Sequence, residues 1–205
     1  MQDQGTFDNL YLPEPSNLVA SVSLVSPSYE AFYSPSIYTL SITPLKRIPA
    51  GGILTIEFPP EIGLVGFSVA SCVVTIAGAA RTVDTINTLK TAPTLIKITG
   101  AFPSGYTTPN VPFTVACGNF RNPRTTATTS SFKIYTYDSS ESALEKGITD
   151  ITTKMTSVPN MDEFKVVNLN VRNGAVDTYT ISFRSKISHS TGDIISFKFP
   201  PEVLL

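Results

Sequence analysis

Residues 37–62 read IYTLSITPLKRIPAGGILTIEFPPEI, and residues 178–203 read TYTISFRSKISHSTGDIISFKFPPEV. The two stretches align without a gap when Phe58 is placed on Phe199. The identical residues are Tyr38, Thr39, Ser41, Gly51, Ile53, Phe58, Pro59, Pro60 and Glu61 in the first stretch, and Tyr179, Thr180, Ser182, Gly192, Ile194, Phe199, Pro200, Pro201 and Glu202 in the second. This agreement is far above chance, so the sequence contains an internal repeat.

The repeat sets the expected domain organisation. We expect a complete unit at 18–160 and a partial second unit at 161–205, with 1–17 as a linker or the end of a preceding unit. The partial unit would hold only its first three strands, where its sibling needs about nine. Two explanations stay open: the chain is part of a longer tandem array, or another chain completes the second unit by adding strands.

Short segments that alternate apolar and polar residues predict half-buried β-strands along the whole chain. They are 21–25, 37–43, 53–58, 72–78, 94–99, 112–117 and 132–138 in the first unit, and 164–171, 178–183 and 193–199 in the second. Only 140–146 has helical propensity, enough for one or two turns. Dense Pro and Gly turn signals separate the segments. The pattern predicts an all-β protein built from antiparallel, Ig-like β-sandwich repeats.

Composition excludes several classes of protein. Charged residues make up 15% of the 205 residues and aromatic residues 10%, which argues against a disordered chain and against coiled coils. The net charge is −1 and the basic residues are scattered, so we expect no nucleic-acid partner. The uncharged stretch 62–80 contains three glycines and several hydroxyl residues, and we interpret it as two core strands with a turn rather than a membrane span.

Two cysteines, Cys72 and Cys117, each lie at the edge of an expected strand. They form either a disulfide within the first unit or two buried thiols. The disulfide is favoured because the chain otherwise has the character of an extracellular protein.

No set of residues suggests catalysis, a cofactor or a metal. The single histidine, His189, lies in an expected turn between serines. Glu57 is replaced by Lys198 in the second copy, and Glu61, which recurs as Glu202, is interpreted as a structural residue after the Pro-Pro turn. Four acidic residues near the junction of the repeats lack the spacing of a calcium loop; they are Asp138, Glu141, Asp162 and Glu163. We therefore expect a protein without enzymatic activity.

Hydroxyl-rich segments are candidates for glycosylation. Ser and Thr together form about 23% of the chain, and no Asn-x-Ser/Thr sequon is present. The candidate O-glycosylation residues are Thr107, Thr108, Thr125, Thr126, Thr128, Thr129 and Ser130. The alternative interpretation is a hydroxyl-rich loop that leads into a strand. Loop tyrosines such as Tyr106 could also bind a glycan by stacking.

The segments FPPEI (58–62) and NPRTTATTSSFKIYTYD (122–138) resemble tandem repeats of very large protist cell-surface proteins, particularly those of ciliates. The likeness spans about Tyr38 to Thr153. It implies an extracellular array of β-sandwich domains that forms a surface coat or filament.

Together these patterns predict a structural component of an extracellular fibre or surface layer, located outside the cell or at its surface. The alternative is an adhesin or glycan-binding arm of a cell-surface protein. Expected partners are other copies of the chain, and glycans in the alternative. Apolar residues of the second unit are expected to contact the neighbouring unit or subunit; they are Val167, Leu169, Ile181, Phe183, Ile195 and Phe197.

Overall fold

The computed structural model of the chain describes residues 16–25, 30–32, 35–65, 70–89, 93–147, 151–158, 161–168, 174, 176–187, 189, 191–201 and 203. The chain divides into two units, which we call unit 1 (Met1–Val158) and unit 2 (Pro159–Leu205). The segment 1–17 is expected to be a linker or the end of a preceding unit. Its residues 1–15 lie outside the described residues. Residues 16 and 17 already belong to the first strand.

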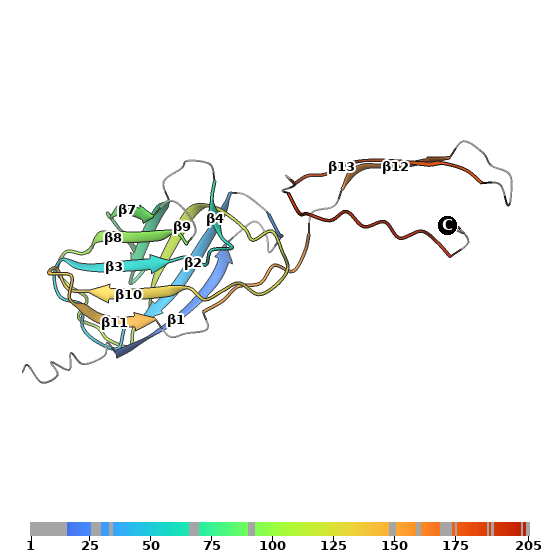
Figure 1. The fold of residues 1–205 in the computed structure, drawn as a ribbon. Helices are drawn as coiled ribbons and strands as arrows, with labels where there is room; N and C mark the ends of the chain where they lie inside the picture. Colours follow the sequence, from blue (N-terminus) through green and yellow to red (C-terminus); the bar gives the residue numbers. More distant parts are fainter. Residues whose placement is uncertain are drawn as a thin grey trace, which may run out of the picture. The chain divides into compact units, whose positions relative to one another are not determined.

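Unit 1 consists of two packed sheets (Figure 1). The first has the order β6-β5-β9-β2-β1, with β4 beside β9. Its strands are β1 (Ser16–Val25), β2 (Ser36–Thr43), β4 (Gly63–Leu64), β5 (Ser71–Ile76), β6 (Ala79–Arg81) and β9 (Phe113–Arg121). All pairings within this sheet are antiparallel.

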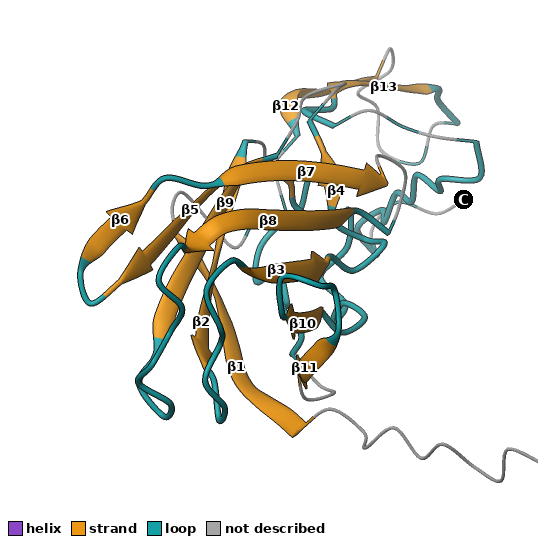
Figure 2. Ribbon diagram, turned by 90° about the vertical axis from the view of Figure 1, so that its left-hand side faces the viewer, coloured by secondary structure: helices purple, strands orange, loops and turns teal. Residues whose placement is uncertain are grey.

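The second sheet of unit 1 has the order β11-β10-β3-β8-β7 and is also antiparallel. Its strands are β3 (Gly52–Glu57), β7 (Asp84–Leu89), β8 (Leu95–Phe102), β10 (Lys133–Tyr137) and β11 (Ala143–Gly147). Strand β1 belongs to both sheets: Ser16–Leu18 pairs with β11 in parallel, and Val19–Val25 pairs with β2. Figure 2 separates the two sheets by viewing unit 1 from the side.

The strand order is consistent with an immunoglobulin constant domain. In that fold the first, second, fifth and fourth strands form one sheet, and the third, sixth and seventh form the other. Strands β1, β2, β9 and β5 follow the first order, and β3, β10 and β11 follow the second. The β7–β8 hairpin is an addition beside β3. The prediction of an all-β protein with an antiparallel β-sandwich is confirmed.

The core lies between the sheets because alternate residues of each strand point inward. Along β2, Tyr38, Leu40 and Ile42 are fully buried, while Ile37, Thr39 and Ser41 are not. An aromatic cluster occupies the centre; its members are Tyr38, Phe58, Phe120 and Phe132. Phe58 and Phe120 are stacked with ring centroids 4.0 Å apart, which joins the end of β3 to β9.

The helical turn that we expect at 140–146 is wrong, because this segment is mainly the strand β11. Pairing with β10 and with the start of β1 outweighs the weak local helical propensity. Glu145 of β11 is fully buried and accepts hydrogen bonds from the amides of Leu45 and Lys46, at 2.7 and 2.9 Å. A short helix on the surface would leave those amides without this partner.

Unit 2 contains one antiparallel hairpin, formed by β12 (Asp162–Asn168) and β13 (Tyr179–Arg184). The strand that we expect at 193–199 does not form. The equivalent strand of unit 1, β3, pairs with β8 on one side and β10 on the other. Among the described residues of unit 2, no strand pairs with 193–199, so this segment lacks the ladder that β3 has in unit 1.

Candidate functional site

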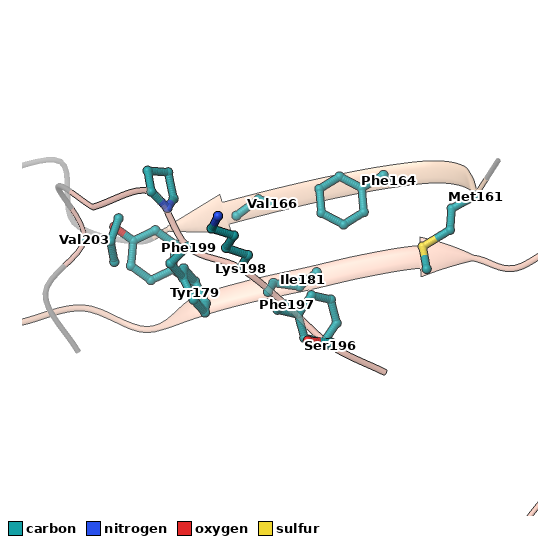
Figure 3. A pocket seen from close by; sticks show the side chains of 11 residues that line it. Met161, Phe164, Val166, Tyr179, Ile181, Ser196, Phe197, Lys198, Phe199 and Val203 are labelled. Carbon is teal, nitrogen blue, oxygen red and sulfur yellow. The ribbon is translucent and has the colours of Figure 1, made fainter. Parts of the chain in front are cut away.

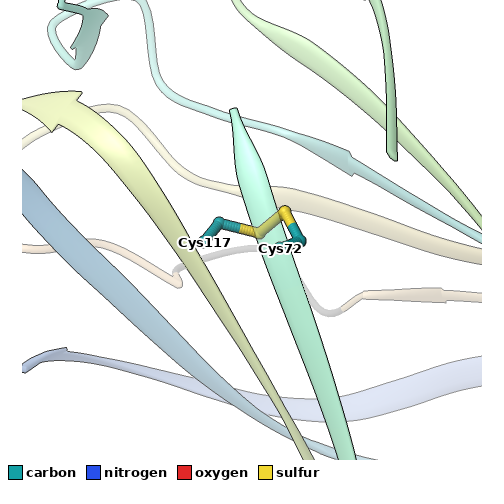
Figure 4. The surroundings of a disulfide bond; sticks show 2 residues. All are labelled: Cys72 and Cys117. Atoms are coloured by element: carbon teal, nitrogen blue, oxygen red, sulfur yellow. A yellow bond between two sulfur atoms is a disulfide. The ribbon is translucent and has the colours of Figure 1, made fainter. Parts of the chain in front are cut away.

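A disulfide joins Cys72 of β5 to Cys117 of β9 (Figure 4). The two residues lie opposite each other in the antiparallel register, and the S–S distance is 2.09 Å. Both cysteines are buried within the core. The bond therefore links neighbouring strands of the first sheet and closes a chain segment with a sequence separation of 45.

The residues considered for chemistry are held in structural contacts. His189 of unit 2 has its Nδ1 3.7 Å from Oδ2 of Asp193 in the same turn region. In unit 1, Glu57 pairs with Lys133 of β10 at 2.7 Å. No cluster of three or more His, Cys, Asp or Glu residues suited to a metal ion occurs among the described residues.

Glu61 holds the segment before β10 in place through two hydrogen bonds. Its Oε1 accepts hydrogen bonds from the backbone N–H and the hydroxyl of Ser130, at 3.0 and 2.8 Å. Partial burial alone would raise the pKa of the Glu61 carboxyl, but these hydrogen bonds outweigh it and hold the pKa below its ordinary value. Glu202, its counterpart in the repeat, lies outside the described residues.

The four acidic residues near the junction are engaged separately. The Asp138 carboxylate accepts hydrogen bonds from the amides of Ser140 and Ser142. The other three form ion pairs, which are Glu141 with Lys97, Asp162 with Lys186 and Glu163 with Arg184. Each carboxylate therefore already has a basic or amide partner.

The candidate O-glycosylation residues differ in accessibility. Thr107, Thr108, Thr125 and Thr128 are exposed, and Thr126 is partly exposed. Thr129 is buried, and its Oγ1 accepts a hydrogen bond from the amide of Thr153 at 3.0 Å, so the folded chain does not present it for modification. Ser130 is exposed, and its hydroxyl is bound to Glu61.

Tyr106 is not a surface platform for a sugar. Its side chain is 4% exposed and packs against Phe102 and Phe113 with ring centroids 6.2 and 5.5 Å away. The hydroxyl donates a hydrogen bond to the carbonyl of Val111 at 2.6 Å. The expected glycan contact through Tyr106 is therefore wrong, because the ring lies in the core and has no face open to a sugar.

Unit 2 carries an apolar pocket of about 440 Å³ on one face of its hairpin (Figure 3). It is lined by Met161, Phe164, Val166, Tyr179, Ile181, Ser196, Phe197, Lys198, Phe199, Pro200 and Val203. We call this surface the open face. Residues 196–200 lie along the hairpin as an extended segment that adds Phe197 and Phe199 to its aromatic side chains.

The open face is built from residues whose repeat counterparts form the core of unit 1. Tyr38 and Ile56 are fully buried in unit 1. Their counterparts on the open face are Tyr179 and Phe197, which are 40% and 43% exposed. The same sequence pattern is thus covered in one unit and uncovered in the other, which identifies the open face as one half of a sandwich core.

Two geometric features of unit 1 recur in unit 2. Val22 of β1 lies opposite Leu40 of β2, and Val166 of β12 lies opposite Ile181 of β13. The ring centroids of Tyr38 and Phe58 are 5.9 Å apart, and those of Tyr179 and Phe199 are 6.0 Å apart. The sequence repeat is therefore also a structural repeat of a strand pair and an aromatic contact.

The residues that we expect to contact a neighbour divide between two faces. Ile181 and Phe197 line the open face, and Phe197 also contacts Phe183, with ring centroids 5.9 Å apart. Val167 is 39% exposed but follows Val166 along β12, so its side chain points to the opposite face of the hairpin. Ile195 is exposed, and Leu169 lies outside the described residues.

The described part of the chain contains no helix that is long and apolar enough to cross a membrane. No protein-family model matches the chain, and no curated protein matches it. Among solved structures, the chain is similar to the crystal structure of BslA, a bacterial hydrophobin, with 13% sequence identity and a TM-score of 0.42. The match covers 69% of this chain and 99% of the BslA chain. A likeness at this TM-score assigns neither a family nor an activity to the chain.

Proposed function

We propose that the chain is a non-enzymatic structural component of an extracellular fibre or surface layer, assembled from repeated β-sandwich units. The single observation that carries this proposal is the structural repeat. Unit 2 reproduces the strand register and the Tyr–Phe contact of unit 1. Repeated units that contact their neighbours through equivalent surfaces form extended arrays.

The disulfide supports a location outside the cell, because such bonds persist in oxidising compartments. The exposed threonines of two loops support a hydrated surface that could carry O-linked glycans; they are Thr107, Thr108, Thr125 and Thr128. The alternative function, a glycan-binding arm, has less support since Tyr106 is buried.

Negative-stain microscopy of the native material, labelled with antibodies against unit 1, tests the proposed function. We expect the label at regular intervals along a filament or across a sheet. Label on dispersed single particles inside cells would contradict the proposal. Dispersed surface particles that bind a glycan array reproducibly would favour the glycan-binding arm instead.

A further inference from the structure

We propose that the open face of unit 2 receives two strands, one resembling β9 that adds to β13 and one resembling β10 that adds beside 193–199, and that an acidic side chain of the second lies opposite Lys198. The donor is a β-sandwich unit of the same kind that is not identical to unit 1. This inference rests on the proposed function, since it names the contact through which one unit of the array would complete the next.

The backbone of unit 2 presents an edge for the first donor strand. In unit 1, β2 pairs with β1 on one side and with β9 on the other. Leu40 faces Val115 of β9, and Ile42 faces Phe113. In unit 2, β13 pairs with β12, the equivalent of β1, and no second pairing of β13 exists among the described residues. A strand like β9 would fit this edge through main-chain hydrogen bonds.

The aromatic side chains specify what the donor must carry. In unit 1, Tyr38 contacts Phe120 and Phe132, with ring centroids 5.8 and 6.0 Å away. Its hydroxyl donates a buried hydrogen bond of 2.9 Å to Oδ1 of Asn122. In unit 2, Tyr179 retains the contact with Phe199 but is 40% exposed. Two donor phenylalanines and an amide would therefore bury Tyr179 as Tyr38 is buried.

Charge distinguishes the donor from the strands of unit 1 itself. Glu57 of β3 lies opposite Lys133 of β10, and the two side chains form an ion pair of 2.7 Å. The repeat replaces Glu57 by Lys198, so a strand identical to β10 would place two lysines opposite each other. Like charges at directly opposite positions destabilise a strand pair. The preferred donor therefore has Asp or Glu at the position of Lys133.

This contact also accounts for the absence of a strand at 193–199. The equivalent strand, β3, forms its ladder with β8 and β10. A two-stranded hairpin alone is at best marginally stable in water, whereas a third strand and a covered apolar face stabilise it. Binding of the donor would thus convert 193–199 into a strand and protect the amides of β12 and β13.

The test supplies the donor covalently by appending to Leu205 a second copy of residues 65–158, because Leu205 aligns with Leu64 in the repeat. Two chimeras are compared by hydrogen exchange, one with Lys133→Glu in the appended copy and one with Lys133 unchanged. A third, matched chimera carries Lys133→Glu together with Phe132→Ser in the appended copy. Analytical ultracentrifugation of the original 205-residue chain accompanies the comparison.

We expect amides of β12, β13 and 193–199 to exchange at least tenfold more slowly in the Lys133→Glu chimera than in the original chain. The chimera with Lys133 unchanged should be less protected, and the one with Phe132→Ser least. Equal exchange in the original chain and all chimeras, with unit 1 still protected, would overturn the proposal. Protection that is as strong with Lys133 unchanged would overturn the charge requirement. A dimer of the original chain with these amides protected would overturn the claim that the donor differs from unit 1, because the occupant would then be a second copy. Microscopy of the native material fails or succeeds independently of these results.

Discussion

Tyr38 and Tyr179 show how one residue of the repeat depends on its surroundings. Burial raises the pKa of the Tyr38 phenol well above its ordinary value, so the hydroxyl remains a hydrogen-bond donor to Asn122 at any physiological pH. Tyr179 occupies the same place in the repeat and is 40% exposed. The two residues therefore provide a matched pair for measuring the effect of a complete core.

Tyr38→Phe should lower the free energy of unfolding of unit 1 by about 1–3 kcal/mol, because Oδ1 of Asn122 loses a buried donor. Tyr179→Phe should change the free energy of unfolding of unit 2 by less than about 0.5 kcal/mol, the usual limit for an exposed position. Urea unfolding followed by circular dichroism measures both values. Equal effects of the two substitutions would contradict the assigned environments.

Glu145 is a buried carboxyl group with one oxygen satisfied and the other not. Oε1 accepts the amides of Leu45 and Lys46, while Oε2 has no hydrogen-bond partner. Thr136 lies opposite it on β10, and its buried Oγ1 also lacks a partner. Burial raises the pKa of Glu145, against the opposing effect of the two amides and of the Lys46 charge.

A raised pKa in the folded state favours the protonated carboxyl. The resulting stability is fully present below the pKa of the unfolded chain and is lost as pH rises through the folded-state pKa. Glu145→Gln removes this titration and keeps an acceptor for the two amides. We expect the variant to be about 1 kcal/mol more stable than the original chain at pH 8, and this advantage to vanish at pH 4. Thermal unfolding at both pH values measures it.

Glu141→Gln is the control for replacing a glutamate by glutamine at an exposed position. Glu141 forms an ion pair with Lys97, so this substitution should lower the free energy of unfolding at pH 8 by about 0–1 kcal/mol rather than raise it. Parallel pH profiles for the Glu145→Gln variant and the original chain would show that Glu145 does not titrate with a shifted pKa.

At the scale of single strands, the alternating pattern was sufficient where both sides of a strand are paired within the chain. The segments expected at 37–43, 53–58 and 112–117 became β2, β3 and most of β9. It was insufficient where a distant partner decides the outcome. Residues 193–199 carry the same pattern as β3, but no described strand is paired with them. The segment 140–146 is mainly a strand because β1 and β10 pair with it.

The candidate site was also only partly predictable from the sequence. The repeat alone indicated an uncovered half core in unit 2, and Ile181 and Phe197 do line the open face. Sequence could not show that Val167 points to the other face, or that Tyr106 and Thr129 are buried. Those three outcomes depend on loop paths and strand register, which the local pattern does not determine.

The disulfide between Cys72 and Cys117 joins two neighbouring strands, β5 and β9. Reduction, or the double substitution Cys72→Ser and Cys117→Ser, should lower the stability of unit 1 by about 4 kcal/mol in the chain-entropy treatment of a 45-residue separation. Differential scanning calorimetry with and without reductant measures the shift in Tm. An unchanged Tm in reducing buffer, with free thiols confirmed by mass spectrometry, would contradict this expectation.

At the scale of the whole molecule, the two units differ in how completely their apolar residues are covered. We expect backbone amides of β2, β3 and β9 to exchange with solvent only on global unfolding of unit 1. Amides of β12 and β13 should exchange orders of magnitude faster, because an isolated hairpin has few buried contacts. Hydrogen exchange followed by mass spectrometry resolves the two rates in one sample. Equal protection of both units would show that the open face is already covered in solution.

Strand β1, which belongs to both sheets, affects how unit 1 responds to tension. Its first residues run parallel to β11, with Ser16 opposite Glu145 and Leu18 opposite Gly147. Ser16 and Gly147 lie at opposite ends of this short ladder, so a force applied outward at these two residues slides the strands past each other. The interstrand hydrogen bonds are then loaded in shear and share the force, whereas strands pulled apart from one end would unzip bond by bond. The remainder of β1 must also separate from β2 before the sandwich can extend.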